Sequence, residues 1–155
     1  MQLSSTDLTN SIQILNDLLA HSYSLYLKTQ NAHWNVQGPS FYMLHLLFES
    51  QYQSLQNAID EIAERIRTLD GVIEASFQKF HQKSGVKECA DDYKDRYILN
   101  VLVNDHDYMI QHIRDLLKKI EKYHDDGTKD LLTSRLKDHE KMHWFLKSHI
   151  KFDNK

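Results

Sequence analysis

The chain contains very few of the residues that interrupt helices. Its 155 residues include four glycines and one proline, and these fall at Gly38-Pro39, Gly71, Gly85 and Gly127. The turns of a β-sandwich or a β-barrel need many more such residues, so this scarcity excludes an all-β fold. We therefore expect an all-α protein built from long helices with few connections.

Between these breaks the apolar residues recur every three or four positions, as they do on one face of a helix. The spacing predicts four long helices, over residues 5–35, 41–69, 92–124 and 128–150. We also expect a short extra helix in the connection between the second and the third. Gly127 is expected to end the third long helix, and Thr128 to cap the fourth. Four helices with one apolar stripe each pack most simply as an antiparallel bundle, so we expect a single domain over residues 1–155.

Charge, cysteine content and hydropathy narrow the classes of function. Nineteen basic residues stand against 22 acidic ones, and no Lys or Arg precedes Lys28, which does not favour nucleic-acid binding. A single cysteine, Cys89, excludes an internal disulfide and suits the reducing cytoplasm. No apolar run approaches about 18 residues, and residues 1–10 do not resemble a secretion signal, so we expect a cytoplasmic protein without a membrane span. The ten histidines and 22 carboxylates are the ligand types of metal sites.

The last predicted helix contains a zinc-peptidase pattern, from His139-Glu140 to His143, with His149 at the position of a third histidine. The fuller pattern has a glycine where this chain has Leu146, because the helix must break there to bring the third histidine back to the metal. On an unbroken helix His149 lies about 15 Å from His139 along the axis. These residues therefore cannot share one zinc ion, and we interpret them as polar residues on a half-solvated face.

Two Glu-x-x-His units, Glu121–His124 and Glu140–His143, match the di-iron pattern inside ferritin-like bundles. In a hairpin that turns near Asp126, the two glutamates differ in depth by roughly 13 Å. They cannot close on one pair of metal ions, so we interpret them as exposed charged residues.

A third group of metal-ligand types lies on the second predicted helix. His45 and Glu49 are spaced i, i+4, as are Asp60 and Glu64, so each pair projects from one helix face. The two pairs face the same way but are separated by about 16 Å along the axis, whereas metal–ligand bonds are about 2 Å long. A second copy of this helix, packed antiparallel across a two-fold axis, would bring one end of each helix to the opposite end of the other. The spacing thus predicts two symmetric sites at an interface between two chains.

His33, near the end of the first predicted helix, can join His45 and Glu49 across the short turn at Gly38-Pro39. Two histidines and three carboxylates suit Fe(II) and leave positions open for an oxidant. The alternative is a polar interface with ion pairs such as Glu61 with Arg65. The spacing alone leaves both interpretations open.

Several segments carry a family signature: residues 31–39, which read Asn-Ala-His-Trp-Asn-Val-Gln-Gly-Pro; Phe41, His45, Glu49 and Tyr52; residues 60–66 and 130–135; and His139-Glu140-Lys141 with Trp144. Together they cover nearly the whole chain, which resembles the Dps miniferritins (DNA-binding proteins from starved cells).

This resemblance implies a ferritin-like subunit that assembles into a hollow homo-dodecamer, with ferroxidase sites between two-fold-related subunits. It implies that His33, His45, Glu49, Asp60 and Glu64 hold two ferrous ions at each site, with Trp34 beside the centre. Such proteins oxidise Fe(II), preferentially with hydrogen peroxide, and store the ferric mineral inside the shell, which protects the cell against oxidative stress.

The resemblance also implies iron-entry pores lined by acidic residues near the start of the last helix, here Asp125, Asp126 and Asp130. Exposed helix caps account for these three residues equally well. Many DNA-coating members carry a lysine-rich N-terminal tail that this sequence lacks, so we expect no direct DNA binding. The alternative function is a nucleoid-coating, DNA-protecting protein with little independent role in iron chemistry.

Overall fold

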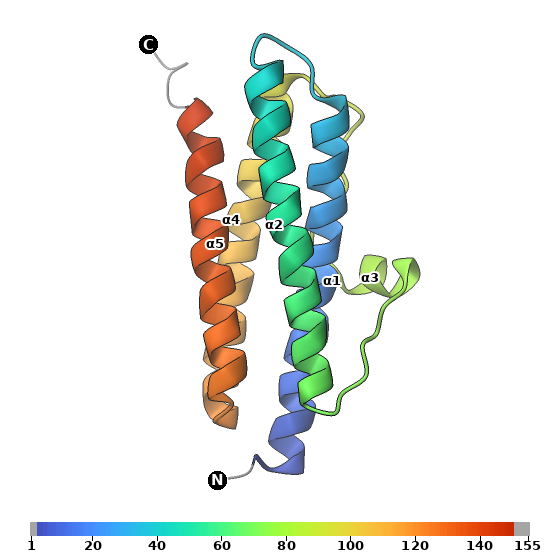
Figure 1. Ribbon diagram of the computed structural model, residues 1–155, viewed down its shortest axis with the longest axis vertical. Coiled ribbons are helices and arrows are strands. Elements are labelled where there is room, and N and C mark those ends of the chain that lie inside the picture. The colour runs from blue at the N-terminus through green and yellow to red at the C-terminus, as the bar shows by residue number, and fades with distance from the viewer. Residues whose placement is uncertain (1–2, 151–155) are drawn as a thin grey trace.

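The computed structural model describes residues 3–150 and places them in five α-helices and one 3₁₀ turn. The elements are α1 (Ser5–Asn35), α2 (Phe41–Thr68), α3 (Phe77–Lys83), α4 (Asp95–Ile120), η1 (Glu121–Tyr123) and α5 (Asp126–Ile150). The four long helices lie side by side, and the short α3 lies outside them against α1 (Figure 1). The predicted all-α four-helix bundle with an extra short helix is confirmed.

The bundle consists of two antiparallel helix pairs, α1 with α2 and α4 with α5 (Figure 1). The connection over residues 69–94 runs back along the bundle, so α2 and α4 point in the same direction. Polar contacts hold this connection on α1: Asn16 Nδ2 donates to the Val72 carbonyl at 3.2 Å, and Lys28 Nζ donates to the Lys87 carbonyl at 2.6 Å. The connection is therefore a fixed part of the bundle surface.

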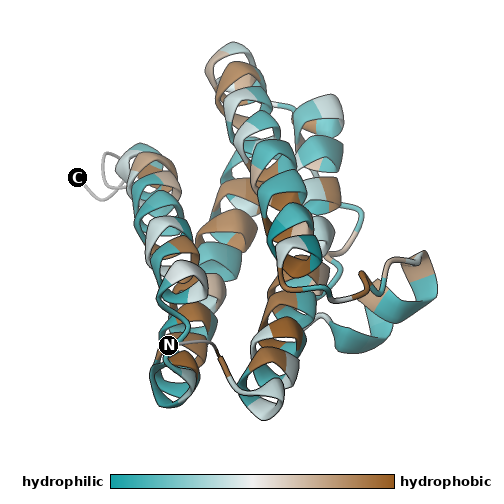
Figure 2. Cartoon of the chain, turned by 60° about the horizontal axis from the view of Figure 1, so that its bottom comes forward, coloured by the Kyte–Doolittle hydropathy of each residue, from teal (hydrophilic) through white to brown (hydrophobic). Residues whose placement is uncertain are grey.

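The apolar stripes face one another inside the bundle, and the outer faces are polar (Figure 2). The largest fully buried side chains come from α1, α2 and α4: Leu15, Leu18, Leu19, Leu25, Leu44, Phe48, Leu55, Ile62, Ile66, Ile98, Leu102 and Met109. Burying each such side chain stabilises the fold by about 1.5–3 kcal/mol. Within residues 3–150, no helix combines the length and the apolar character that a membrane span requires.

The turn between α4 and α5 differs from the predicted one. His124, not Gly127, adopts the left-handed backbone conformation, with φ of 53°. Asp125 then caps α5, because its Oδ1 accepts the Thr128 N–H at 3.0 Å and also binds Arg65 Nη2 at 2.7 Å. Burial raises the pKa of Asp125, but these hydrogen bonds and the Arg65 charge outweigh it and hold that pKa below its ordinary value. The predicted roles of Gly127 and Thr128 were wrong because the sequence does not show that Arg65 of α2 faces Asp125.

The turn between α1 and α2 is fixed against the start of α4. Gln37 accepts the Asp95 N–H at 2.8 Å and donates its own N–H to the Tyr93 carbonyl at 2.9 Å. The Asp95 carboxylate then accepts the Ser40 N–H at 3.1 Å, at the first turn of α2. This turn sets how the end of α1 and the beginning of α2 face each other.

Replacing Gly38 with alanine should disturb this turn. Gly38 has φ of 134°, and an added Cβ would lie 2.5 Å from Asp95 Oδ2. We expect Gly38→Ala to lower the free energy of unfolding by about 1–3 kcal/mol, measured by urea denaturation. Gln82→Ala, at an exposed position of α3, is the control. Equal losses in the two variants would contradict this account of the turn.

Candidate metal centre

His33 of α1 and His45 of α2 form a reciprocal pair. His33 Nδ1–H donates to the His45 carbonyl at 2.7 Å, and His45 Nδ1–H donates to the His33 carbonyl at 2.8 Å. The rings stack with centroids 3.9 Å apart. Because each Nδ1 carries the proton, each neutral ring keeps a lone pair on Nε2, which is the tautomer that a metal-binding histidine needs. The structure thus brings His33 and His45 together across the turn at Gly38-Pro39.

Aromatic rings hold this histidine pair from two sides. Tyr52 meets the His33 ring edge-on at 5.2 Å, and Phe41 lies 5.2 Å from the His45 ring. Glu49 lies one helical turn after His45 and is half-buried. The two imidazoles and this carboxylate therefore come from a rigid corner of the bundle, as a preorganised ligand set requires.

Asp60 and Glu64 lie further along α2, and both are exposed. Within residues 3–150, one group of three His, Cys, Asp or Glu residues has ligand atoms all within 4.8 Å of one another, and it contains none of the five predicted ligands. A single chain thus brings His33 and His45 together but does not close the predicted site. This agrees with the separation of about 16 Å expected from helix geometry.

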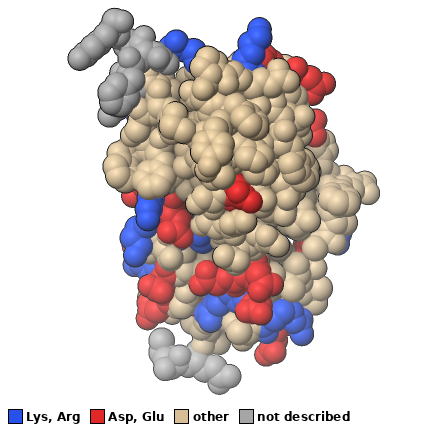
Figure 3. Space-filling view, turned by 45° about the horizontal axis from the view of Figure 1, so that its top comes forward, with Lys and Arg blue, Asp and Glu red and all other residues tan. Residues whose placement is uncertain are grey.

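Five large apolar side chains within four residues of His33 or His45 in the sequence are exposed to solvent: Trp34, Phe41, Tyr42, Met43 and Leu46. We call these five residues the apolar patch. In Figure 3 this end of the bundle, brought toward the viewer, carries few charged side chains. Tyr42 is 71% exposed and Trp34 60% exposed. Exposed apolar side chains gathered at one end of a bundle indicate an interaction site.

Trp34 and Phe41 stand out in the sequence as part of the family signature, but the exposed apolar patch was not predicted. The sequence does contain a signal for this patch, because Tyr42, Met43 and Leu46 lie off the core stripe that Leu44 and Phe48 define. Apolar residues on the outer face of a helix, next to candidate ligands, indicate a surface that a partner covers.

The residues of the zinc-peptidase pattern on α5 contact other side chains rather than one another. His139 is fully buried and its Nδ1 lies 3.0 Å from His106 Nδ1 of α4. His143 pairs with Asp107 at 3.0 Å, and Glu140 pairs with Arg114 at 2.9 Å. These residues therefore have separate partners. The predicted half-solvated face fits His143, His149 and Glu140, but it was wrong for His139, which packs against His106 in the core.

The paired Glu-x-x-His units also remain apart. Glu121 pairs with Lys129 at 3.1 Å near the α4–α5 turn, whereas Glu140 pairs with Arg114 further along α5. Both glutamates are exposed. Each carboxylate thus has a surface cation as its partner.

The buried pair His106 and His139 predicts sensitivity to acid. Burial lowers the pKa of His106 to about 3, and burial also lowers the pKa of His139 well below its ordinary value. Both rings stay neutral in the fold, and each Nε2 lacks a hydrogen-bond partner among the described residues. The unfolded chain binds protons at these rings below about pH 6.5, so stability is complete above that pH and falls as the pH drops.

We expect the free energy of unfolding to fall by up to about 1.4 kcal/mol per pH unit for each histidine between pH 6.5 and pH 4. Replacing both rings, in His106→Leu/His139→Leu, should flatten that slope in denaturant titrations. His81→Gln, which changes an exposed histidine of α3, should leave it unchanged. An equal slope in the double variant and the unsubstituted protein would contradict the assignment.

The three predicted pore residues differ in their surroundings. Asp125 is buried and committed to capping α5 and to Arg65. Asp126 and Asp130 are exposed on the first turns of α5. A pore lined by acidic side chains stays a prediction for these two exposed residues.

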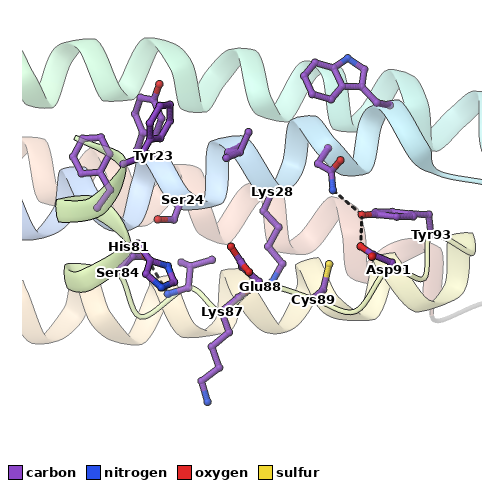
Figure 4. Close-up of a pocket in the computed structure, with 16 residues that line it drawn as sticks. Tyr23, Ser24, Lys28, His81, Ser84, Lys87, Glu88, Cys89, Asp91 and Tyr93 are labelled. Carbon is purple, nitrogen blue, oxygen red and sulfur yellow. Dashed lines mark hydrogen bonds between the residues drawn. The ribbon is translucent and has the colours of Figure 1, made fainter. Parts of the chain in front are cut away.

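A pocket of about 520 Å³ lies between α1, α3 and the connection that precedes α4 (Figure 4). Tyr23, Lys28, Cys89 and Tyr93 contribute to its wall, and Asn31 donates to Tyr93 Oη at 2.9 Å. None of the five predicted metal ligands lines it. Trp34, however, lines the pocket as well as belonging to the apolar patch, so the pocket borders the surface around the candidate metal centre.

Comparisons with known proteins assign the chain to a family. The ferritin-like domain family, Ferritin, matches residues 12–154. A DNA protection during starvation protein of Agrobacterium fabrum is 34% identical over 140 residues, which cover 90% of this chain and 86% of that protein. The chain belongs to the Dps family of ferritin-like proteins. An uncharacterised low temperature-induced protein of Nostoc is 41% identical over 141 residues, 90% of this chain and 79% of the relative.

Solved Dps structures share the fold closely. A Dps protein of Vibrio cholerae, described as a member of a broad superfamily of ferritin-like diiron-carboxylate proteins, superposes with a TM-score of 0.90 at 34% identity. The match covers 96% of this chain and 93% of that one. DpsC of Streptomyces coelicolor gives 0.92 at 30% identity, over 97% and 88% of the two chains. The bundle, the connection between α2 and α4, and α3 are therefore those of a Dps subunit.

Proposed function

We propose that this Dps-family protein is a ferroxidase and iron-storage protein whose metal centre is shared between two chains. The observation that carries the proposal is the reciprocal pair of His33 and His45, with both Nε2 lone pairs available beside Glu49. Asp60 and Glu64 of the partner subunit complete the ligand set across a two-fold axis. Two ferrous ions are the substrate of each such centre.

The apolar patch supports the association that this centre requires. Tyr42 lies three residues before His45 and seven before Glu49, so the three share one face of α2. A two-fold contact over that face buries the patch and, by symmetry, brings each histidine pair to the carboxylates of the other chain. We propose that these dimers assemble further into a dodecamer that encloses a cavity for the ferric mineral.

Two ferrous ions at one centre supply the two electrons that the reduction of one hydrogen peroxide molecule requires. Each ferrous ion gives up one electron, and the pair reduces one peroxide molecule, with two protons, to two molecules of water. Hydroxyl radical forms when a single ferrous ion delivers one electron, so a paired site avoids it. The chain's own contribution is to hold the two ions together with rigidly placed imidazoles and carboxylates.

We assign supporting roles to three further residues. Trp34 follows His33 directly and is placed beside the centre once the partner covers it. Asp126 and Asp130, exposed on the first turns of α5, are proposed to line an entry path for ferrous ions. Their carboxylates offer the oxygen ligands that attract a divalent cation.

Anaerobic titration tests the proposal directly. Protein loaded with two ferrous ions per chain, then mixed with hydrogen peroxide, should develop ferric absorbance with two irons oxidised per peroxide. Dioxygen should give the same product more slowly. Single-electron stoichiometry, with hydroxyl radical caught by a spin trap, would contradict a paired centre. His33→Ala should slow the reaction, while His81→Gln should not.

Protection of DNA, the role named for several relatives, follows in this proposal from removal of iron and peroxide in the cytoplasm. Direct coating of DNA is the competing function. A gel shift at about 150 mM salt that survives iron removal would support coating, and its absence would favour protection through iron chemistry.

A further inference from the structure

We propose a second metal site, contained within one chain, in which Asp17 and His21 of α1 and His112 of α4 bind a divalent transition-metal ion such as Zn²⁺. Their ligand atoms all lie within 4.8 Å of one another. Within residues 3–150 this is the one group of three or more such residues that meets this distance. The site differs from the proposed iron centre in its residues and in needing no partner chain.

The three ligand atoms lie almost as close together as they would around a bound ion. Asp17 Oδ1 lies 3.2 Å from His21 Nδ1 and 2.5 Å from His112 Nε2. The two imidazole rings stack with centroids 4.1 Å apart. Zinc ligands at about 2.1 Å in a tetrahedron lie about 3.4 Å from one another. His21 Nδ1 also lies 2.8 Å from the Asp17 carbonyl. To bind an ion, Nδ1 must give up that hydrogen bond, and small side-chain rotations must open the contact between Asp17 and His112.

Neighbouring groups can orient His21 as a ligand. His21 Nε2 lies 3.2 Å from Tyr108 Oη and accepts the Gly85 N–H at 3.0 Å. A metal on Nδ1 requires the proton on Nε2, which then donates to Tyr108 Oη. Gly85 N–H loses its acceptor in that state, so binding of an ion is coupled to the connection between α2 and α4.

The site is accessible and carries the right charge. The Asp17 side chain is 41% exposed and that of His112 19% exposed, whereas the His21 side chain is almost fully buried. Burial raises the pKa of Asp17, but hydrogen bonds from His112 and His21 outweigh it and hold that pKa well below the ordinary value. The carboxylate is thus ionised, and a metal ion would replace protons now shared with the histidines.

Two histidines and one carboxylate leave a fourth position of a tetrahedral ion open to water, a ligand set that suits Zn²⁺. An ion held there connects α1, in the first helix pair, to α4, in the second. Because it binds only the folded chain, the ion should raise the unfolding temperature as its concentration rises. This role is independent of iron oxidation.

The test uses the full-length protein with two of the five proposed iron ligands removed, His33→Ala/His45→Ala, so that the proposed iron centre binds the probe only weakly. Calorimetric titration with Zn²⁺ should show one ion per chain. Adding His112→Gln should weaken that binding at least about tenfold, and adding Asp17→Asn should do the same. Adding His81→Gln, an exposed histidine on α3, serves as the matched control and should change nothing.

Cobalt provides the second readout, because tetrahedral Co²⁺ has intense visible absorption that octahedral Co²⁺ lacks. The His33→Ala/His45→Ala protein should develop that absorption, and the His112→Gln derivative should not. Zn²⁺ should raise the unfolding temperature of the first protein and not of the second. Binding that is equal with and without His112→Gln, or no binding to either protein, would overturn the proposal and leave an ion pair of Asp17 with His112. His112→Gln alone should leave ferrous oxidation unchanged, so the two proposals fail separately.

Discussion

Shells assembled from equal amounts of His45→Ala and Asp60→Ala chains should recover about one quarter of the ferrous oxidation rate of the unsubstituted protein. Each variant alone should lose at least about tenfold, because every one of its centres lacks a ligand. The rate is measured as ferric absorbance after rapid mixing with hydrogen peroxide. Recovery from two inactive proteins is the largest qualitative change that the shared centre predicts.

The value of about one quarter follows from random pairing across the two-fold axis. Half of the interfaces then join one chain of each kind, and one of the two centres at such an interface receives His45 and Asp60 from the chains that retain them. The other centre lacks both ligands. Interfaces between identical variants contain no complete centre.

A matched mixture provides the control. His33→Ala and His45→Ala remove ligands from the same half of the centre, so every centre in their mixed shells lacks one ligand. No recovery is expected from that mixture. Equal rates for the two mixtures would contradict the assignment of Asp60 to the opposite chain.

Tyr42→Lys should dissociate the assembly and abolish oxidation without altering a ligand. Tyr42 is 71% exposed in the single chain and shares a face of α2 with His45 and Glu49. A lysine there would have to bury an unpaired ammonium group at the two-fold contact, once from each chain, at a cost of several kcal/mol. The proposed dodecamer has a mass of about 221 kDa, twelve chains of 18.4 kDa. The molar mass measured by light scattering should fall from that value to that of small species. The oxidation rate should fall at least about tenfold with it.

Val72→Lys is the control for this variant. Val72 is 72% exposed and follows the far end of α2, away from the histidine pair. The same change of charge at the same exposure should leave mass and rate unaltered. A Tyr42→Lys protein that keeps its full mass and rate would show that the apolar patch is not the two-fold contact.

Helix boundaries could be predicted from the sequence because helix formation depends on local spacing. The periodicity placed α1 at its observed bounds and α2 within one residue. It failed at the α4–α5 turn, where the start of α5 depends on the contact between Asp125 and Arg65. That contact joins residues 60 positions apart, and no local pattern shows it.

Part of the candidate centre could also be predicted, because helix geometry is regular. A rigid rise of about 1.5 Å per residue shows that His45 and Asp60 cannot meet on one helix. The exchange of Nδ1 hydrogen bonds between His33 and His45 could not be predicted, because it requires the turn that Gln37 and Asp95 fix against each other. The inferred second metal site could not be predicted from the sequence either, because His112 lies 91 residues after His21.

Anomalous diffraction from crystals soaked anaerobically in Fe(II) tests the shared centre most directly. The account predicts iron peaks at a two-fold interface, bound by His33, His45 and Glu49 of one chain and by Asp60 and Glu64 of the partner subunit. Iron bound entirely by residues of one chain, or a two-fold interface formed without these five side chains, would contradict it.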